Sequence, residues 1–148
     1  MAQTPDAAAA DSPRTRWPDL LQDSGIAERR DRMGEELGLV PALTTEIAVE
    51  DLILYLERTA PDSALLSDLA ENRRTIADML ARAAGEIYHH NARQGGAWAA
   101  QLRGSPASAR DTLVIYSRHW LCGLLRERHG PDVMALLPDG FASGHPPA

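Results

Sequence analysis

The sequence predicts an all-α protein, a four- to five-helix antiparallel bundle with disordered N- and C-terminal tails. Ala and Leu account for 24 and 19 of the 148 residues, whereas aromatic residues make up 5%. Ala and Leu are strong helix formers, while strands favour β-branched and aromatic residues. Apolar side chains also recur at intervals of three and four, with short Pro- or Gly-containing breaks between the periodic segments. Amphipathic helices joined by short connections favour an antiparallel bundle.

The domain boundaries follow from composition. Residues 1–16 combine an Ala run with Pro and Asp and show no apolar period, so we expect a disordered tail. This segment lacks the basic start and long apolar centre of a secretory signal, which predicts a cytoplasmic protein. Residues 17–137 form the expected helical domain, beginning with a short turn around Trp17. Residues 138–148 are rich in Pro and Gly and are expected to form a flexible tail.

The first two helices are delimited by candidate caps. We expect the first to begin at the cap Ser24 and to end at Leu37, before a left-handed Gly38. We expect the second to cover 46–58, with Thr44 and Thr45 as its caps. Its apolar centre, 52–56, is also compatible with a buried strand, but acidic residues on both sides favour a buried helix.

The third helix has the clearest period and is expected to extend for about 30 residues, or about 45 Å. Arg73 occupies the one missing apolar position in a four-and-three repeat that consists of Leu66, Leu69, Ile76, Leu80, Ala83 and Ile87. A second row alternates in charge at steps of four and is expected to be a solvated flank. That row consists of Arg74, Asp78, Arg82, Glu86 and His90.

The C-terminal part predicts a short helical segment, a long helix and a final turn. The short segment carries Trp98 and Leu102, and the long helix begins at Ser105-Pro106 and ends at Gly130-Pro131. The turn covers 133–137. The expected buried stripe of the long helix consists of Leu113, Val114, Ser117, Trp120, Leu121 and Leu124.

Charge is divided along the chain, whose net charge is −6. Residues 1–72 hold 15 acidic residues and 6 Arg, whereas 73–128 hold 9 Arg and 4 acidic residues. We expect the two halves to attract each other within one fold or across a dimer. All 15 basic residues are Arg, which is typical of a GC-rich genome and favours a bacterial source. The net negative charge makes nucleic-acid binding the least favoured role, although an Arg-rich regulator stays an alternative.

Cys122 is the first candidate reactive group. Its helix places Arg118 and Arg126 four residues to either side and His129 seven residues further on, close to the same helical angle. Nearby cations favour the thiolate, so these four residues form a candidate catalytic cluster. In the alternative interpretation Cys122 is a small buried hydrophobe. A single Cys excludes a disulfide framework and Cys-rich zinc modules.

The segment Glu86 to His90 is a candidate metal site. Glu86 and His89 have the Glu-x-x-His spacing that ferritin-like bundles use at di-iron centres, and His90 lies beside them. Such a centre needs the motif twice, and here it occurs once. Glu46 and Glu50 of the second helix are the candidate additional ligands.

The second helix also contains candidate Mg²⁺ ligands, namely Glu46, Glu50 and Asp51. Residues 46–56 resemble helical nucleotide pyrophosphatases, in which paired carboxylates on adjacent helices hold Mg²⁺ against a triphosphate. The resemblance covers about a dozen residues. The first-helix acids are incomplete, and no basic phosphate-binding motif follows. We therefore predict no cofactor.

Because no set of residues converges on a known chemistry, the sequence favours a non-enzymatic protein that works through helix-mediated association. We expect a self-associating oligomer or an accessory subunit of another protein. A small bundle enzyme or metal protein is the main alternative. The candidate interaction residues are Glu50, Asp51, Tyr55, Trp98 and Trp120, although the two tryptophans are explained most simply as core.

Overall fold

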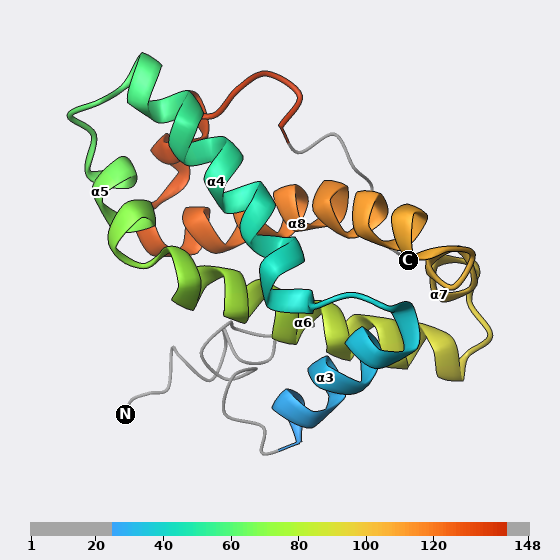
Figure 1. The fold of residues 1–148 in the computed structure, drawn as a ribbon. Helices are drawn as coiled ribbons and strands as arrows, with labels where there is room; N and C mark the ends of the chain where they lie inside the picture. Colours follow the sequence, from blue (N-terminus) through green and yellow to red (C-terminus); the bar gives the residue numbers. More distant parts are fainter. Residues whose placement is uncertain (1–24, 142–148) are drawn as a thin grey trace.

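The computed structural model describes residues 25–141 and confirms the all-α prediction (Figure 1). The expected tail 1–16, the turn at Trp17, the cap Ser24 and residues 142–148 lie outside the described residues. The described helices, slightly more numerous than predicted, are α3 (Ile26–Leu37), α4 (Pro41–Thr59), α5 (Ala64–Glu71), α6 (Arg73–Arg93), α7 (Ala97–Leu102), α8 (Pro106–His129) and the 3₁₀ helix η1 (Pro131–Leu136).

The helices pack as a bundle around one core. α6 and α8 run in opposite directions, and α4 lies across both of them (Figure 1). α3 packs on α6, and the short α7 connects α6 to α8. The core is made of side chains that are apolar and fully enclosed, among them Met33, Leu52, Leu56, Leu69, Leu80, Tyr88, Leu113 and Leu121. None of the described helices is both long and apolar enough to cross a membrane.

The start of α4 corrects the prediction that Thr44 and Thr45 cap a helix over 46–58. The helix begins at Pro41, which occupies the first-turn position where its missing N–H costs nothing. Thr44 and Thr45 are therefore buried inside the helix. Thr44 donates a hydrogen bond to the carbonyl of Val40 at 3.0 Å, and Thr45 donates one to the carbonyl of Ala77 on α6 at 2.6 Å. The hydroxyl group of Thr44 is thus hydrogen-bonded locally, and that of Thr45 is hydrogen-bonded across the α4–α6 contact.

The predicted long third helix is interrupted, so the expectation of about 30 continuous residues is wrong. Asn72 separates α5 from α6 with φ −116° and ψ 22°, outside the helical region. Its side-chain amide donates to the carbonyl and the carboxylate of Asp68 at 3.1 and 2.8 Å, which closes α5. The apolar period continues through Arg73, and for this reason the break is not visible in the periodicity.

Several predicted helix ends are confirmed. Gly38 is left-handed with φ 72°, and its N–H donates to the carbonyl of Gly34 at 2.9 Å. Ser105 caps α8 by accepting a hydrogen bond from the N–H of Ser108 at 3.1 Å. α8 ends at His129, before Gly130. The start of the first helix is a correction, because the N-cap is Gly25 and not the predicted Ser24.

Gly85 allows α3 to lie close to α6. A Cβ atom at this position would be 2.9 Å from the Cα and 3.0 Å from the backbone nitrogen of Arg30. Because both of these atoms belong to the backbone of α3, a larger side chain at residue 85 would push the two helices apart. The α3–α6 distance therefore depends on a glycine in the middle of α6.

Candidate functional site

The acidic and basic halves of the sequence form ion pairs with each other inside the fold. Arg118 of α8 donates to Asp51 of α4 at 2.9 Å, across 67 residues. Arg73, at the start of α6, contacts both Glu46 and Glu50 of α4, at 2.9 and 3.5 Å respectively. These contacts join the acidic half of the chain to the basic half, in agreement with the expectation that the two halves attract each other within one fold.

Asp68 of α5 is the centre of a third link between the halves. Arg128 donates from Nε to Oδ2 at 3.0 Å and from Nη2 to Oδ1 at 2.5 Å, and His129 Nε2 lies 2.7 Å from the same Oδ2. Burial alone would raise the pKa of Asp68, but the hydrogen bonds from Arg128 and His129 outweigh it, and the pKa is lowered. Asp68 is therefore an ionised carboxylate, and in this form it holds the C-terminal end of α8.

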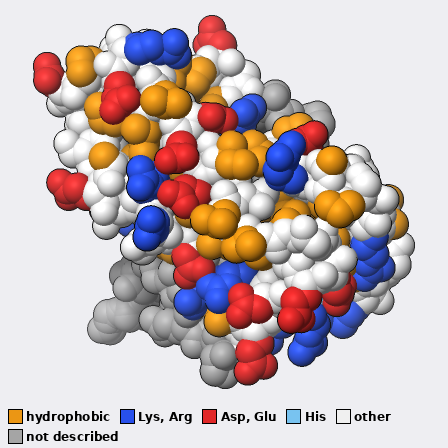
Figure 2. All heavy atoms as spheres, viewed as in Figure 1, with side chains coloured by type: hydrophobic (Ala, Val, Ile, Leu, Met, Phe, Trp, Pro, Cys, Tyr) orange, Lys and Arg blue, Asp and Glu red, His pale blue; other side chains and the backbone are white. Residues whose placement is uncertain are grey.

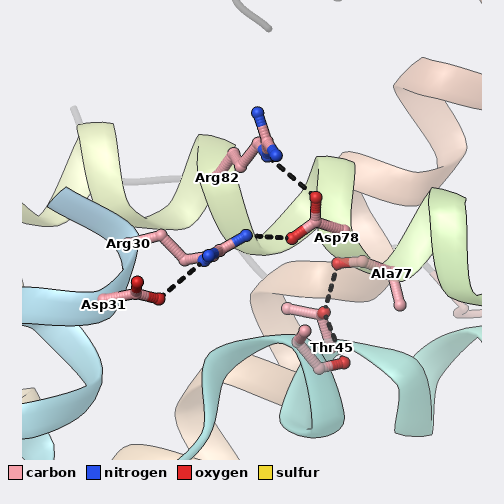
Figure 3. Close-up of polar contacts among 7 residues, drawn as sticks. Arg30, Asp31, Thr45, Ala77, Asp78 and Arg82 are labelled. Carbon is pink, nitrogen blue, oxygen red and sulfur yellow. Dashed lines mark hydrogen bonds and ion pairs between the residues drawn. The ribbon is translucent and has the colours of Figure 1, made fainter. Parts of the chain in front are cut away.

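The two acidic members of the charged row on α6 contact α3, which corrects the prediction of a solvated flank for Asp78 and Glu86, whereas Arg74 and His90 are exposed. Asp78 accepts from Arg30 of α3 and from Arg82 one turn further along α6, the latter at 2.8 Å (Figure 3). Arg30 also donates to its neighbour Asp31 at 3.0 Å. Glu86 pairs with Arg29 of α3. This row could not be assigned to an interface from α6 alone, because its partners lie about 50 residues earlier.

Cys122 is a buried thiol, and two of its three predicted partners, Arg118 and His129, contact other residues. Its exposed fraction is 3%, and burial raises its pKa to about 11, with a smaller opposing effect of Arg126. Arg118 is directed to Asp51 and His129 to Asp68. The thiol borders a hollow of about 320 Å³ that is otherwise lined by η1 and the segment ending at Phe141. The geometry favours the interpretation of Cys122 as a small hydrophobe.

We predict that a thiol-modifying reagent at pH 8 labels Cys122 of the folded chain about 100-fold more slowly than that of the urea-unfolded chain. Only the thiolate reacts, and a pKa of about 11 leaves a much smaller thiolate fraction than the ordinary thiol pKa does. The measurement is the labelling rate followed by mass spectrometry. Equal rates in the two states would mean that Cys122 is accessible in the folded chain and that burial does not reduce its thiolate fraction.

The candidate metal ligands are separated and engaged elsewhere. Glu86 pairs with Arg29, and Nε2 of His89 lies 3.0 Å from the Arg29 carbonyl oxygen, while His90 is exposed. Glu46 and Glu50 contact Arg73. Within residues 25–141 no three His, Cys, Asp or Glu side chains come together as a possible metal site.

Trp98 and Trp120 belong to an aromatic cluster with Tyr116. Trp98 and Tyr116 have ring centroids 5.3 Å apart, and Trp120 lies 6.1 Å from Trp98 and 6.0 Å from Tyr116. Both tryptophans are buried, with exposed fractions of 6% and 7%. The cluster packs α7 against α8, as the core interpretation of these residues predicts.

An exposed apolar surface runs along α4. Among residues 25–141, the large hydrophobic side chains that are exposed include Val40, Leu43, Ile47 and Leu54, with exposed fractions of 57%, 63%, 38% and 60%. We call these four residues the α4 stripe; Val40 is the N-cap, and the other three lie on the helix. Successive spacings of three, four and seven place them on one side of α4. The face drawn in Figure 2 displays hydrophobic side chains along α4 with acidic ones between them.

A further exposed large hydrophobic side chain lies on α8. Ile115 is 44% exposed and lies one turn before Arg118, the residue that reaches Asp51 of α4. The sequence prediction named Glu50, Asp51 and Tyr55 on this helix but missed Val40, Leu43 and Ile47. Their spacing was the available signal, and the misplaced caps at Thr44 and Thr45 left Val40 and Leu43 outside the helix.

No known protein family, curated protein or solved structure matches this chain.

Proposed function

We propose that this protein works by binding another polypeptide through the α4 stripe, as a non-enzymatic association module. The observation that carries the proposal is the concentration of exposed large apolar side chains on this one helix. An apolar row of this kind, bordered by charged residues, is typical of a surface that another helix covers. The opposite side of α4 supplies Leu52 and Leu56 to the core, so the helix has an apolar face on both sides.

The charged residues beside the stripe have different roles. Asp51 is held by Arg118 and acts in the α4–α8 contact, whereas the Glu50 side chain is 51% exposed and its contact to Arg73 is 3.5 Å. Glu50 is therefore available to a partner, and we assign Asp51 to the fold. Tyr55 is partly buried and packs against the core.

We predict that the double variant Leu43→Glu/Leu54→Glu abolishes association without unfolding the chain. Both side chains are exposed, so the helix tolerates the substitutions, but a covered interface would then enclose two unpaired carboxylates. Loss of the two most exposed apolar contacts costs about 2 kcal/mol each, or about 1,000-fold in affinity. The measurement is native mass spectrometry of untagged protein gently isolated from its own host.

A matched control adds the same two charges elsewhere. Thr75→Glu/Gln101→Glu alters exposed positions on α6 and α7 and is expected to keep the wild-type assembly. Thermal unfolding by circular dichroism checks that both double variants remain folded. A wild-type protein that is always a single chain, or a Leu43→Glu/Leu54→Glu variant that stays assembled, contradicts the proposal.

A further inference from the structure

We infer that the partner of the α4 stripe is an amphipathic helix with basic side chains beside its apolar face, rather than a second copy of this chain. The inference rests on the proposed function and specifies its partner. It follows from the register of the stripe and from the charges that lie within it.

The stripe belongs to a regular helical seam. Spacings of three and four alternate through Val40, Leu43, Ile47, Glu50, Leu54 and Glu57. This is the repeat by which one helix packs along another. The seam spans 17 residue steps, or about 26 Å, which suits one partner helix of about 18 residues. Four of its positions are apolar and exposed, and the remaining two are exposed glutamates.

The charge of the seam is negative and only partly compensated inside the chain. α4 carries four acidic residues and one cation, Arg58, at its C-terminal end. Arg73 is shared between Glu46 and Glu50, and the contact to Glu50 is the longer of the two. In the described part of the chain Glu57 has no ion-pair partner. A helix that covers this seam would therefore have to place its own apolar face against the carboxylates of Glu50 and Glu57.

A second copy does not provide the complementary charge. Parallel pairing of two α4 helices in register places Glu50 opposite Glu50 and Glu57 opposite Glu57. Antiparallel pairing that matches Leu43 with Leu54 brings Glu50 of each copy near Glu46 and Glu50 of the other. Both arrangements enclose like charges, which disfavours association, and each copy has a net charge of −6. Lys or Arg on a partner helix would instead neutralise Glu50 and Glu57.

The test uses two synthetic helical peptides as probes of the purified full-length chain. Both have the same Leu and Ile seam on an Ala-rich background, and one carries Lys while the other carries Glu at the flanking positions. Binding is measured by fluorescence anisotropy at low salt, where surface charges are least screened. We expect the chain to bind the Lys peptide at least about tenfold more tightly than the Glu peptide.

A charge-reversal variant makes the test specific to the seam. In Glu50→Lys/Glu57→Lys the order of the two peptides should invert. The control Glu71→Lys/Glu127→Lys makes the same change in net charge at exposed positions on α5 and α8 and should keep the wild-type order. Equal binding of the two peptides, no binding of either, or an unchanged order in the seam variant overturns the inference.

The oligomeric state distinguishes failure of this inference from failure of the proposed function. Sedimentation of the purified chain alone should show a monomer. A dimer that Leu43→Glu/Leu54→Glu dissociates would assign the stripe to a second copy and overturn the inference, but the stripe would still be an association surface. A single chain in material isolated from the host would instead overturn the proposed function itself.

Discussion

Replacement of Gly85 by valine is expected to lower the free energy of unfolding by about 2–3 kcal/mol. The Cβ would stand 2.9 Å from the Cα of Arg30, and backbone atoms cannot rotate away as the end of a side chain can. α3 is held on α6 by the Arg29–Glu86 and Arg30–Asp78 pairs as well as by its apolar side chains. The steric conflict must therefore separate the helices or bend one of them.

Gly123 provides the matched control, because it also lies inside a long helix but has no atom within 4 Å of the position of its Cβ. Gly123→Ala should stabilise the protein by up to about 1 kcal/mol, since alanine loses less backbone entropy in a helix. Urea unfolding followed by circular dichroism measures both effects. Equal stability of Gly85→Val and the wild type would show that α3 does not pack closely on α6.

Trp120→Ala is expected to destabilise the protein by about 3–5 kcal/mol, the largest effect of a single truncation in this set. The indole is 7% exposed and packs edge-on against Trp98, so its loss leaves a cavity between α7 and α8. The effect on association should follow from unfolding and not from a lost contact with a partner.

Ile115→Ala, five residues earlier on the same helix, distinguishes surface from core. Ile115 is 44% exposed, and its truncation should change stability by no more than about 0.5 kcal/mol. Urea titrations of the two variants provide the comparison. Wild-type stability of Trp120→Ala would exclude the aromatic cluster from the core and return Trp120 to the candidate interaction residues.

Features determined by adjacent residues were predictable from the sequence. Gly38 ends α3 because a left-handed residue there costs glycine nothing, and Ser105-Pro106 begins α8 because both residues suit a first turn. The buried stripe of α8 was also predicted, since Leu113, Trp120 and Leu124 recur on one side of the helix. These signals are local and need no knowledge of the neighbouring helices.

Features that depend on distant contacts were missed. Thr45 has the appearance of a cap, but its hydroxyl group is satisfied by the carbonyl of Ala77, 32 residues later. Asp78 has the appearance of a solvated charge until Arg30 of α3 is placed beside it. The candidate site was affected in the same way, because the early start of α4 is what brings Leu43 and Val40 into one row with Leu54.

The ion pairs that join the two halves also have a consequence for folding during synthesis. Asp51 and Asp68 leave the ribosome long before their partners Arg118 and Arg128, which follow 67 and 60 residues later. Until α8 is available, α4 can pack on α6 but lacks its contact with α8, and Asp51 and Asp68 lack their arginine partners. We therefore expect the native packing of α4 and α5 to be completed only once α8 has been synthesised.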